Sequence, residues 1–208
     1  MLHHSILKLL APLRAKVWSQ LAVGEHAGIL VVDASAMKHD SCAFLESTRQ
    51  ALSLIEKFDK LRFRRVQHYL RFIVHEELPC GLARYDAELG SCTIDFDRLK
   101  ISIYPTGATH VYAAALVHEA THGKIARQSI RPTGAHRKRV ERLCCLEETR
   151  FMRRVNPKLG EGWMERAWRP EADGAAWTMR WWDRVAAVWK RRRDSKRMPN
   201  KHLQPTPR

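Results

Sequence analysis

The segment Val117–Gly123, which reads V-H-E-A-T-H-G, constrains this chain more than any other. His118 and His122 are four residues apart, so on a helix they lie one turn apart on the same face. Two neutral imidazoles placed in this way can bind one Zn²⁺, and Glu119 then lies beside the metal. From there its carboxylate can accept a proton from a metal-activated water. The spacing predicts a zinc site with His118 and His122 as ligands and Glu119 as general base.

The flanking residues favour a helix around this segment. Tyr104–Gly107 reads as a turn, and Thr106 or Thr109 can cap a helix start. The stretch His110–Ala120 is rich in Ala and contains neither Gly nor Pro, and Gly123 stands where a helix can end. The alternative interpretation is an amphipathic core helix that carries two histidines without a metal.

A second helix offers the third ligand. Residues 137–155 form a continuous helical pattern that stops before Asn156-Pro157. A catalytic zinc takes three protein ligands and keeps one position open. Glu141 lies nineteen positions after His122, which leaves room for a loop that reverses the chain. We expect Glu141 to be the third ligand, because a carboxylate beside an apolar stripe is costly to bury unless it meets a cation.

Glu148 is the alternative third ligand. It lies seven residues after Glu141 on the same helix face, with Cys144 and Cys145 between them. It can instead accept a hydrogen bond from one imidazole N–H, a partner that such sites usually need. Without a metal, both glutamates would form ordinary helical salt bridges to Arg137, Arg142 or Arg150.

Two further helices are predicted before the metal-binding segment. Asp40 is a suitable N-cap for a helix over residues 41–58, where apolar residues form one stripe. A second helical pattern follows Asp59 and runs to Ile73. Its other positions are basic and are interleaved with Phe63, Tyr69 and Phe72, which favours a solvated helix face over a nucleic-acid contact; these basic residues are Arg62, Arg64, Arg65 and Arg71.

A small sheet is predicted immediately before the metal helix. Residues 82–85, 92–96 and 101–104 alternate with short turns, which indicates two or three antiparallel strands. The expected fold class is α+β: a small antiparallel sheet packed on the His-bearing helix and the following Glu-bearing helix. Extra helices are expected at the N-terminus, within residues 6–23, and at the C-terminus, within residues 175–191.

The composition divides the chain into three parts. Residues 1–40 form an N-terminal packing segment, in which residues 28–32 are either a short buried strand or part of that loose segment. Residues 41–189 form the predicted metallohydrolase domain, and residues 190–208 form a basic tail with a disordered composition.

Charge and cysteine content bear on partners and compartment. The net charge is +15, and residues 180–208 alone contain ten basic and two acidic residues. This tail is either a solvated segment or a contact for an anionic partner. No apolar run approaches the roughly 20 residues of a membrane span, and we identify no secretory signal. Five cysteines without a disulfide spacing favour the cytoplasm.

The two motifs together resemble a known superfamily. H-E-A-T-H-G at 118–123, followed by R-V-E-R-L-C at 139–144, is similar to the gluzincin branch of the zincin metallopeptidases. More narrowly, it resembles small bacterial metallopeptidase-like proteins with H-E-A-T-H and a downstream V-E-x-x-C helix. The likeness covers about residues 59–155 and implies a compact α+β domain that binds zinc through His118, His122 and Glu141, with Glu119 as general base and acid.

The chain departs from this pattern in one respect. Well-studied gluzincins carry a Tyr or His after the ligand helix that stabilises the oxyanion, and this sequence has no recognisable equivalent. The candidates for that role are Tyr104, Tyr112 and His136.

We therefore expect a cytoplasmic zinc metallohydrolase that acts on a peptide or protein substrate. The alternatives are a zincin-fold binding protein without turnover and a basic nucleic-acid-binding regulator.

Overall fold

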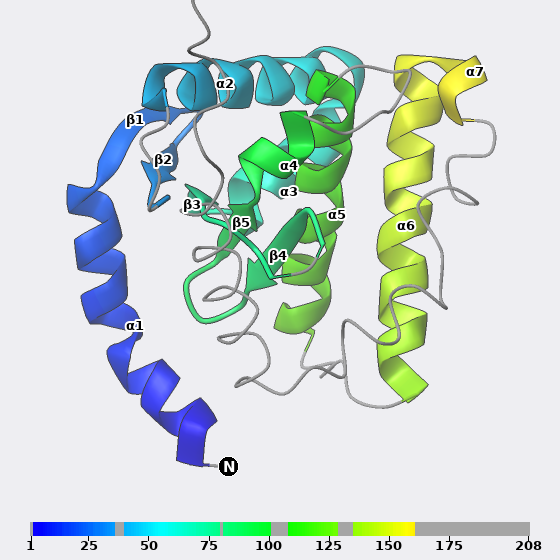
Figure 1. Ribbon diagram of the computed structural model, residues 1–208. Helices are drawn as coiled ribbons and strands as arrows, with labels where there is room; N and C mark the ends of the chain where they lie inside the picture. The colour runs from blue at the N-terminus through cyan, green and yellow to red at the C-terminus, as the bar shows by residue number, and fades with distance from the viewer. Residues whose placement is uncertain (1, 36–39, 80, 101–107, 129–134, 161–208) are drawn as a thin grey trace, which may run out of the picture. The chain divides into compact units, whose positions relative to one another are not determined.

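The computed structural model describes residues 2–35, 40–79, 81–100, 108–128 and 135–160, and the structural statements below concern these residues. They form an α+β fold, as expected (Figure 1). The helices are α1 (Leu2–Gln20), α2 (Ser41–Phe58), α3 (Lys60–Tyr69), α4 (Phe96–Lys100), α5 (Ala108–Arg127), α6 (Ala135–Val155) and α7 (Pro157–Gly160).

The sheet is larger than expected, and it is mixed rather than antiparallel. Its strands are β1 (Ala22–His26), β2 (Ile29–Asp33), β3 (Phe72–His75), β4 (Ala83–Asp86) and β5 (Ser91–Ile94). They lie in the order β1-β2-β3-β5-β4. The outer pairs β1–β2 and β4–β5 are antiparallel, whereas β2–β3 and β3–β5 are parallel.

The prediction of an antiparallel sheet is therefore correct for the β4–β5 hairpin and wrong for the centre. The physical reason is the crossover through α2 and α3, which returns the chain to the sheet in the same direction as β2. The predicted strand at 101–104 lies outside the described residues, as do the predicted C-terminal helix and the basic tail.

The helical pattern predicted to reach Ile73 ends earlier, because α3 stops at Tyr69 and Leu70 adopts an extended conformation. The next residues, F-I-V-H, form β3, which is buried at all four positions. A short apolar run of this kind cannot be assigned to helix or strand from its periodicity alone. For residues 28–32 the strand alternative is the correct one, since β2 pairs with β3.

The helix caps agree with the sequence. Asp40 accepts hydrogen bonds from the backbone N–H groups of Cys42 and Ala43 at the start of α2. Asp59 accepts one from the N–H group of Arg62 at the start of α3. Each cap satisfies helix N–H groups that have no partner within the helix.

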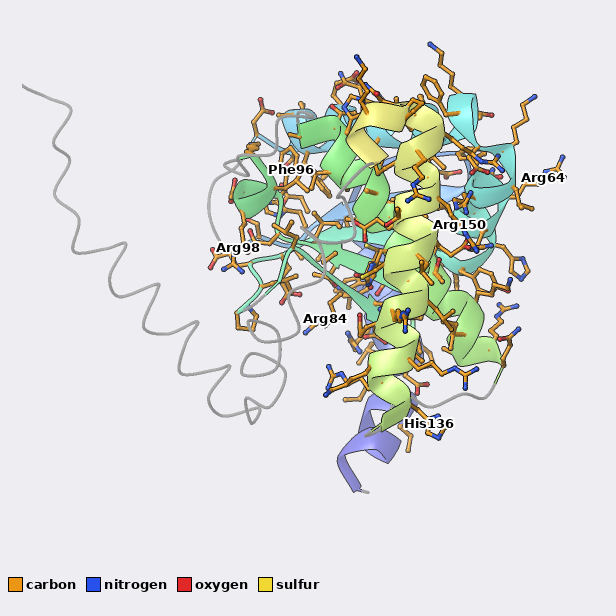
Figure 2. The ribbon with its side chains drawn as sticks, turned by 90° about the vertical axis from the view of Figure 1, so that its right-hand side faces the viewer. Arg64, Arg84, Phe96, Arg98, His136 and Arg150 are labelled. Atoms are coloured by element: carbon orange, nitrogen blue, oxygen red, sulfur yellow. The ribbon has the colours of Figure 1, made fainter. Side chains whose placement is uncertain are left out.

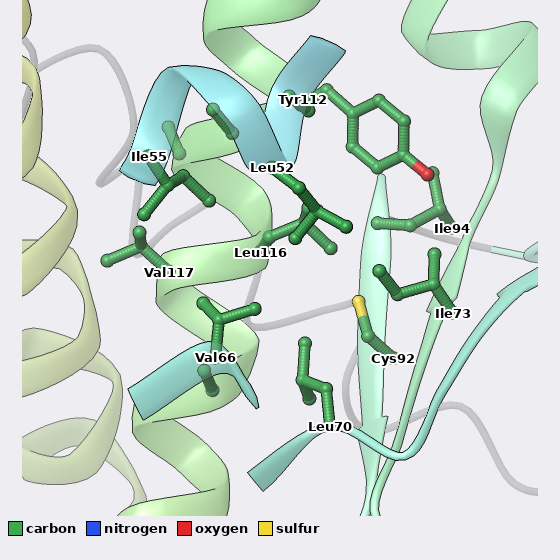
Figure 3. Close-up of a cluster of buried hydrophobic side chains, with 14 of the residues drawn as sticks. Leu52, Ile55, Val66, Leu70, Ile73, Cys92, Ile94, Tyr112, Leu116 and Val117 are labelled. Atoms are coloured by element: carbon green, nitrogen blue, oxygen red, sulfur yellow. The ribbon is translucent and has the colours of Figure 1, made fainter. Parts of the chain in front are cut away.

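The main core lies between one face of the sheet and the helices α2, α3 and α5 (Figure 3). Ile73 and Cys92 point from the strands toward Leu52, Val66 and Leu116 on these helices. Each such side chain contributes about 1.5–3 kcal/mol when it is fully buried. The opposite face of the sheet is lined by Val32, Phe72 and Val74, against which Ala15 and Trp18 of α1 pack.

The sequence predicts that the helix ends at Gly123, but α5 continues to Arg127. Gly123 is required by a close approach instead. A Cβ atom added there would lie 2.8 Å from the Cβ atom of Tyr69 and 2.9 Å from the hydroxyl oxygen of Tyr85. The glycine lets α5 pack tightly on α3 and β4, which fixes the position of the helix that carries His118 and His122.

The described residues contain no helix that is long and apolar enough to cross a membrane.

Candidate metal centre

The candidate site lies between α5 and α6, which run side by side (Figure 1). His118 and His122 lie one turn apart on α5, and Glu141 and Glu148 lie two turns apart on α6. Figure 2 looks onto α6, with His136 near its first turn and Arg150 nearer its other end. The structure therefore brings together both predicted histidines and both candidate third ligands.

Three donor atoms converge on one point. The Nε2 atoms of His118 and His122 are 3.2 Å apart, and the Oε2 atom of Glu141 lies 3.4 Å from each of them. In a tetrahedral zinc site with ligand distances of about 2.0–2.2 Å, neighbouring donor atoms lie about 3.3–3.5 Å apart. The spacing of the three atoms fits a single metal ion. Their side chains are only 15–16% exposed, so the site is reachable but largely desolvated.

Glu148 occupies a different position. Its Oε2 atom lies 3.0 Å from the Nδ1 atom of His118, on the other side of the imidazole ring from the Nε2 atom. A neutral His118 that donates its Nδ1–H to Glu148 presents the lone pair of Nε2 to His122 and Glu141. This geometry corresponds to the alternative role of Glu148, in which it orients a ligand instead of binding the metal.

The site favours positive charge at its centre. Burial raises the pKa of Glu141, but hydrogen bonds with His118 and His122 and the charges of these residues outweigh it and lower the pKa to about 2. Burial lowers the pKa of His118, but hydrogen bonds with Cys145, Glu141 and Glu148 and the charge of Glu119 outweigh it and raise the pKa well above its ordinary value. Both shifts have the direction expected where carboxylates stabilise positive charge on the imidazoles that lie between them.

Glu119 lies on α5 beside the two histidines and is 6% exposed. Burial raises the pKa of its carboxyl group, while the charges of His118 and His122 oppose the shift. A carboxylate whose pKa is raised toward neutrality is a better general base than an ordinary surface glutamate. These properties suit the role that the sequence predicts for Glu119.

Two thiols belong to the same cluster, which the sequence interpretation did not foresee. The sulfur atom of Cys144 lies within 4.8 Å of a ring nitrogen of His118 and of a ring nitrogen of His122. The sulfur atom of Cys145 lies within the same distance of a ring nitrogen of His118 and of a carboxylate oxygen of Glu148. Their spacing from Glu141 was the available signal, because residues three and four positions apart share a helix face. Burial raises the pKa of Cys144, so its thiol is neutral unless a cation contacts it.

A network of ion pairs holds α6 against α3. The carboxylate of Glu147 lies 3.1 Å from Arg62, 2.7 Å from Arg65 and 2.7 Å from Arg150. Arg62 also pairs with the fully buried Asp59. The prediction of a solvated basic face is therefore wrong for Arg62 and Arg65, because Glu147, the acidic residue that pairs with both, is distant in sequence.

The remainder of that basic face is exposed. Arg64 points into solvent (Figure 2), and Arg71 is also exposed.

The two candidates for oxyanion stabilisation that belong to the described residues, Tyr112 and His136, are not brought to the site. The hydroxyl of Tyr112 is fully buried and lies 2.7 Å from the Thr48 hydroxyl, on the face of α5 that packs on α2. His136 is exposed near the start of α6. Tyr104 lies outside the described residues. For Glu141 the described contacts are with the two imidazoles and not with the arginines of its own helix.

Comparison of the chain with models of known families, with curated proteins and with solved structures gave no match. The resemblance carried by the two motifs therefore has no independent support, and the function rests on the geometry of the site.

Proposed function

We propose that this protein is a zinc-dependent metallohydrolase that cleaves peptide bonds. The observation that carries the proposal is the convergence of His118 Nε2, His122 Nε2 and Glu141 Oε2, all within 3.2–3.4 Å of one another. These are three donors of the types that a catalytic zinc takes, and they come from two helices that the core packing fixes. The H-E-x-x-H spacing and the downstream glutamate agree with the gluzincin resemblance.

The roles of the residues follow from their positions. His118, His122 and Glu141 would hold the metal, and Glu148 would fix the ring of His118 through Nδ1. A bound zinc would supply Lewis-acid polarisation of the scissile carbonyl and of water. Glu119 would accept the proton of the attacking water and deliver it to the leaving amine, which is the work of a general base and acid.

The compartment proposed for this activity is the cytoplasm. Among the described residues Cys42, Cys92, Cys144 and Cys145 are free thiols, which is typical of a reducing environment. The proposed substrate is a peptide or a protein segment. A separate proposal is that the basic residues of the chain bind an anionic partner.

The test is hydrolysis of a quenched fluorescent peptide library by the full chain and by Glu119→Gln. Both proteins should contain zinc, and the variant should lose hydrolysis by about 10²–10⁴-fold. The His122→Ala variant is the control that should lose both metal and activity. A zinc-loaded wild type that cleaves no member of the library, or a Glu119→Gln variant with full activity, would argue for a binding protein without turnover.

A further inference from the structure

The stripe of α6 that faces α5 contains thiols as well as carboxylates. Glu141, Cys144, Cys145 and Glu148 recur at the three- and four-residue spacing of one helix face. The two carboxylates already have distinct positions, one at the Nε2 atoms and one at the Nδ1 atom of His118. The proposed function leaves the two thiols between them without a role.

Cys144 shares its group with both histidines whose Nε2 atoms approach each other. It groups with His118 and His122, and the three ligand atoms lie within 4.8 Å of one another. In a tetrahedral site, zinc–sulfur and zinc–nitrogen distances of about 2.3 and 2.0–2.1 Å place sulfur and nitrogen about 3.5 Å apart. A side-chain adjustment of about 1 Å is therefore sufficient to bring the sulfur to the metal.

The surroundings of Cys144 exclude water from its sulfur. Its side chain is fully buried and packs in a small apolar cluster with Ile125 and Val140. A thiol in such a place is either a small hydrophobic residue or a metal ligand. The adjacent imidazoles distinguish this position from an ordinary core cysteine.

Cys145 is less well placed for the same role. It groups with His118 and Glu148, and Glu148 lies at the Nδ1 atom of His118. The imidazole nitrogen that approaches His122 and Glu141 is Nε2. Cys145 therefore belongs to the group that orients His118, and Cys144 to the group that surrounds the metal.

We propose that Cys144 is the fourth ligand of the metal centre, so that the resting site is formed by His118, His122, Glu141 and Cys144. This inference rests on the metal site of the proposed function and concerns its regulation. On binding, the thiol S–H bond breaks, its proton leaves to solvent, and the sulfur donates a lone pair to the metal. Four protein ligands close a zinc site, whereas a hydrolase needs one position for water or substrate. Cys144 thus occupies the position that water or substrate needs and must leave the metal for each turnover, so the wild type hydrolyses peptides more slowly than a chain without this thiol.

The proposal is tested with cobalt(II) as the probe. The full chain is freed of metal, loaded with one equivalent of Co²⁺, and examined by visible and near-ultraviolet absorption. A thiolate ligand gives an intense thiolate-to-cobalt charge-transfer band, which nitrogen and oxygen donors do not give. We expect this band in the wild type and in Cys145→Ala, and its loss in Cys144→Ala, which should still bind one Co²⁺ and retain the ligand-field bands.

Cys145→Ala is the matched control, since it removes the neighbouring buried thiol from the same helix. Cys92→Ala is a second control that removes a buried thiol from the sheet. Circular dichroism melting establishes that each variant is folded. If Cys144→Ala does not fold, Cys144→Ser provides the same test, because a hydroxyl is nearly isosteric and gives no charge-transfer band.

The affinity for zinc gives an independent readout. In competition with a chromogenic chelator, the zinc affinity of Cys144→Ala should be lower than that of the wild type by more than roughly 10- to 100-fold. That range is the loss of affinity expected when only a residue that orients a ligand is removed. In a peptide cleavage assay the zinc-loaded variant should be more active than the wild type, because the fourth position is open.

The outcomes separate this inference from the proposed function. Ligand-field bands without a charge-transfer band in the wild type would overturn the role of Cys144 and leave the metal centre intact. Loss of the band in Cys145→Ala and not in Cys144→Ala would also overturn it. A folded wild type that binds no Co²⁺ would overturn both.

Discussion

The Nδ1 atom of His118 lies 3.0 Å from the carboxylate of Glu148, while its Nε2 atom lies 3.4 Å from the carboxylate of Glu141. One imidazole ring therefore contacts two glutamates of α6 through its two nitrogens. This arrangement fixes the rotation of the ring, and when a metal takes Nε2 the remaining proton is on Nδ1, where Glu148 accepts it. It also gives the two glutamates different roles, which can be separated by mutation.

Replacing Glu148 with Ala should weaken zinc binding without abolishing it. The expected loss is about 10- to 100-fold in affinity, because the change removes the acceptor that orients His118. Glu148→Gln is the matched control, since its amide oxygen can still accept the Nδ1–H, and its loss should be smaller. The measurement is chelator competition at fixed pH. Complete loss of zinc from Glu148→Ala would make Glu148 a ligand and contradict the assignment.

The stability contributed by Glu147 should depend on pH. Burial raises the pKa of Glu147, but hydrogen bonds with Arg65 and Arg150 and the charges of Arg62 and Arg65 lower it below the ordinary value. A carboxyl group whose folded pKa is depressed contributes stability above its unfolded pKa of about 4.3. That stability is lost as the pH falls through the folded pKa.

Glu147→Gln should therefore destabilise the protein by about 1–3 kcal/mol at pH 7, because it removes the negative charge that pairs with the largely buried Arg62 and Arg65. Urea denaturation at pH 7 and at a pH below the folded pKa measures the effect, and the difference from wild type should vanish at the lower pH. Glu46→Gln, a change at an exposed position on α2, should alter the free energy of unfolding by no more than about 0.5 kcal/mol at both pH values. If Glu147→Gln lowered the free energy of unfolding by the same amount at every pH, the ion pairs of Glu147 would not be the cause of that loss.

Gly123→Ala should destabilise the protein although alanine is the better helix former. The added methyl group would meet the side chains of Tyr69 and Tyr85 at 2.8–2.9 Å. Overpacking of this kind costs about 1–3 kcal/mol, against about 1 kcal/mol gained in helix propensity. Thermal or urea denaturation measures the net loss, with the exposed Lys124→Ala as control. A variant more stable than wild type would mean that α5 does not approach β4 so closely.

Tyr112→Phe should lower stability and leave metal binding unchanged. The Thr48 hydroxyl donates to the carbonyl of Phe44, so the Tyr112 hydroxyl is the donor in its 2.7 Å contact with Thr48. Losing this buried hydrogen bond costs about 1 kcal/mol. Denaturation and zinc titration of the same sample measure both quantities. An effect on hydrolysis with unchanged stability would restore Tyr112 as a candidate for the site.

The parts of the fold that could be predicted are those determined by local sequence. The Asp40 cap and the helices that carry His118 and Glu141 follow from capping residues and periodicity, which act over a few positions. The parallel strands could not be predicted in this way. Residues 72–75 form a short apolar run whose assignment depends on the pairing of β3 with β2, about forty residues earlier in the sequence.

The candidate site shows the same division. Because His118 and His122 are four residues apart, they lie one turn apart on the same face of any helix that contains both. Their proximity therefore follows from the sequence. The choice between Glu141 and Glu148 depends on the alignment of α6 along α5, which long-range packing determines. The inward turn of Arg62 and Arg65 likewise depends on Glu147, eighty or more residues later in the sequence.

The most direct test of the metal centre is the metal content per chain, measured by elemental analysis after dialysis against a weak chelator. We expect about one zinc per chain in the wild type and in Glu148→Ala, and well below one in His122→Ala and in Glu141→Ala. Circular dichroism should show that all four proteins are folded. A folded wild type without zinc, or a Glu141→Ala variant that keeps its full complement, would contradict the assignment of His118, His122 and Glu141 as the metal ligands.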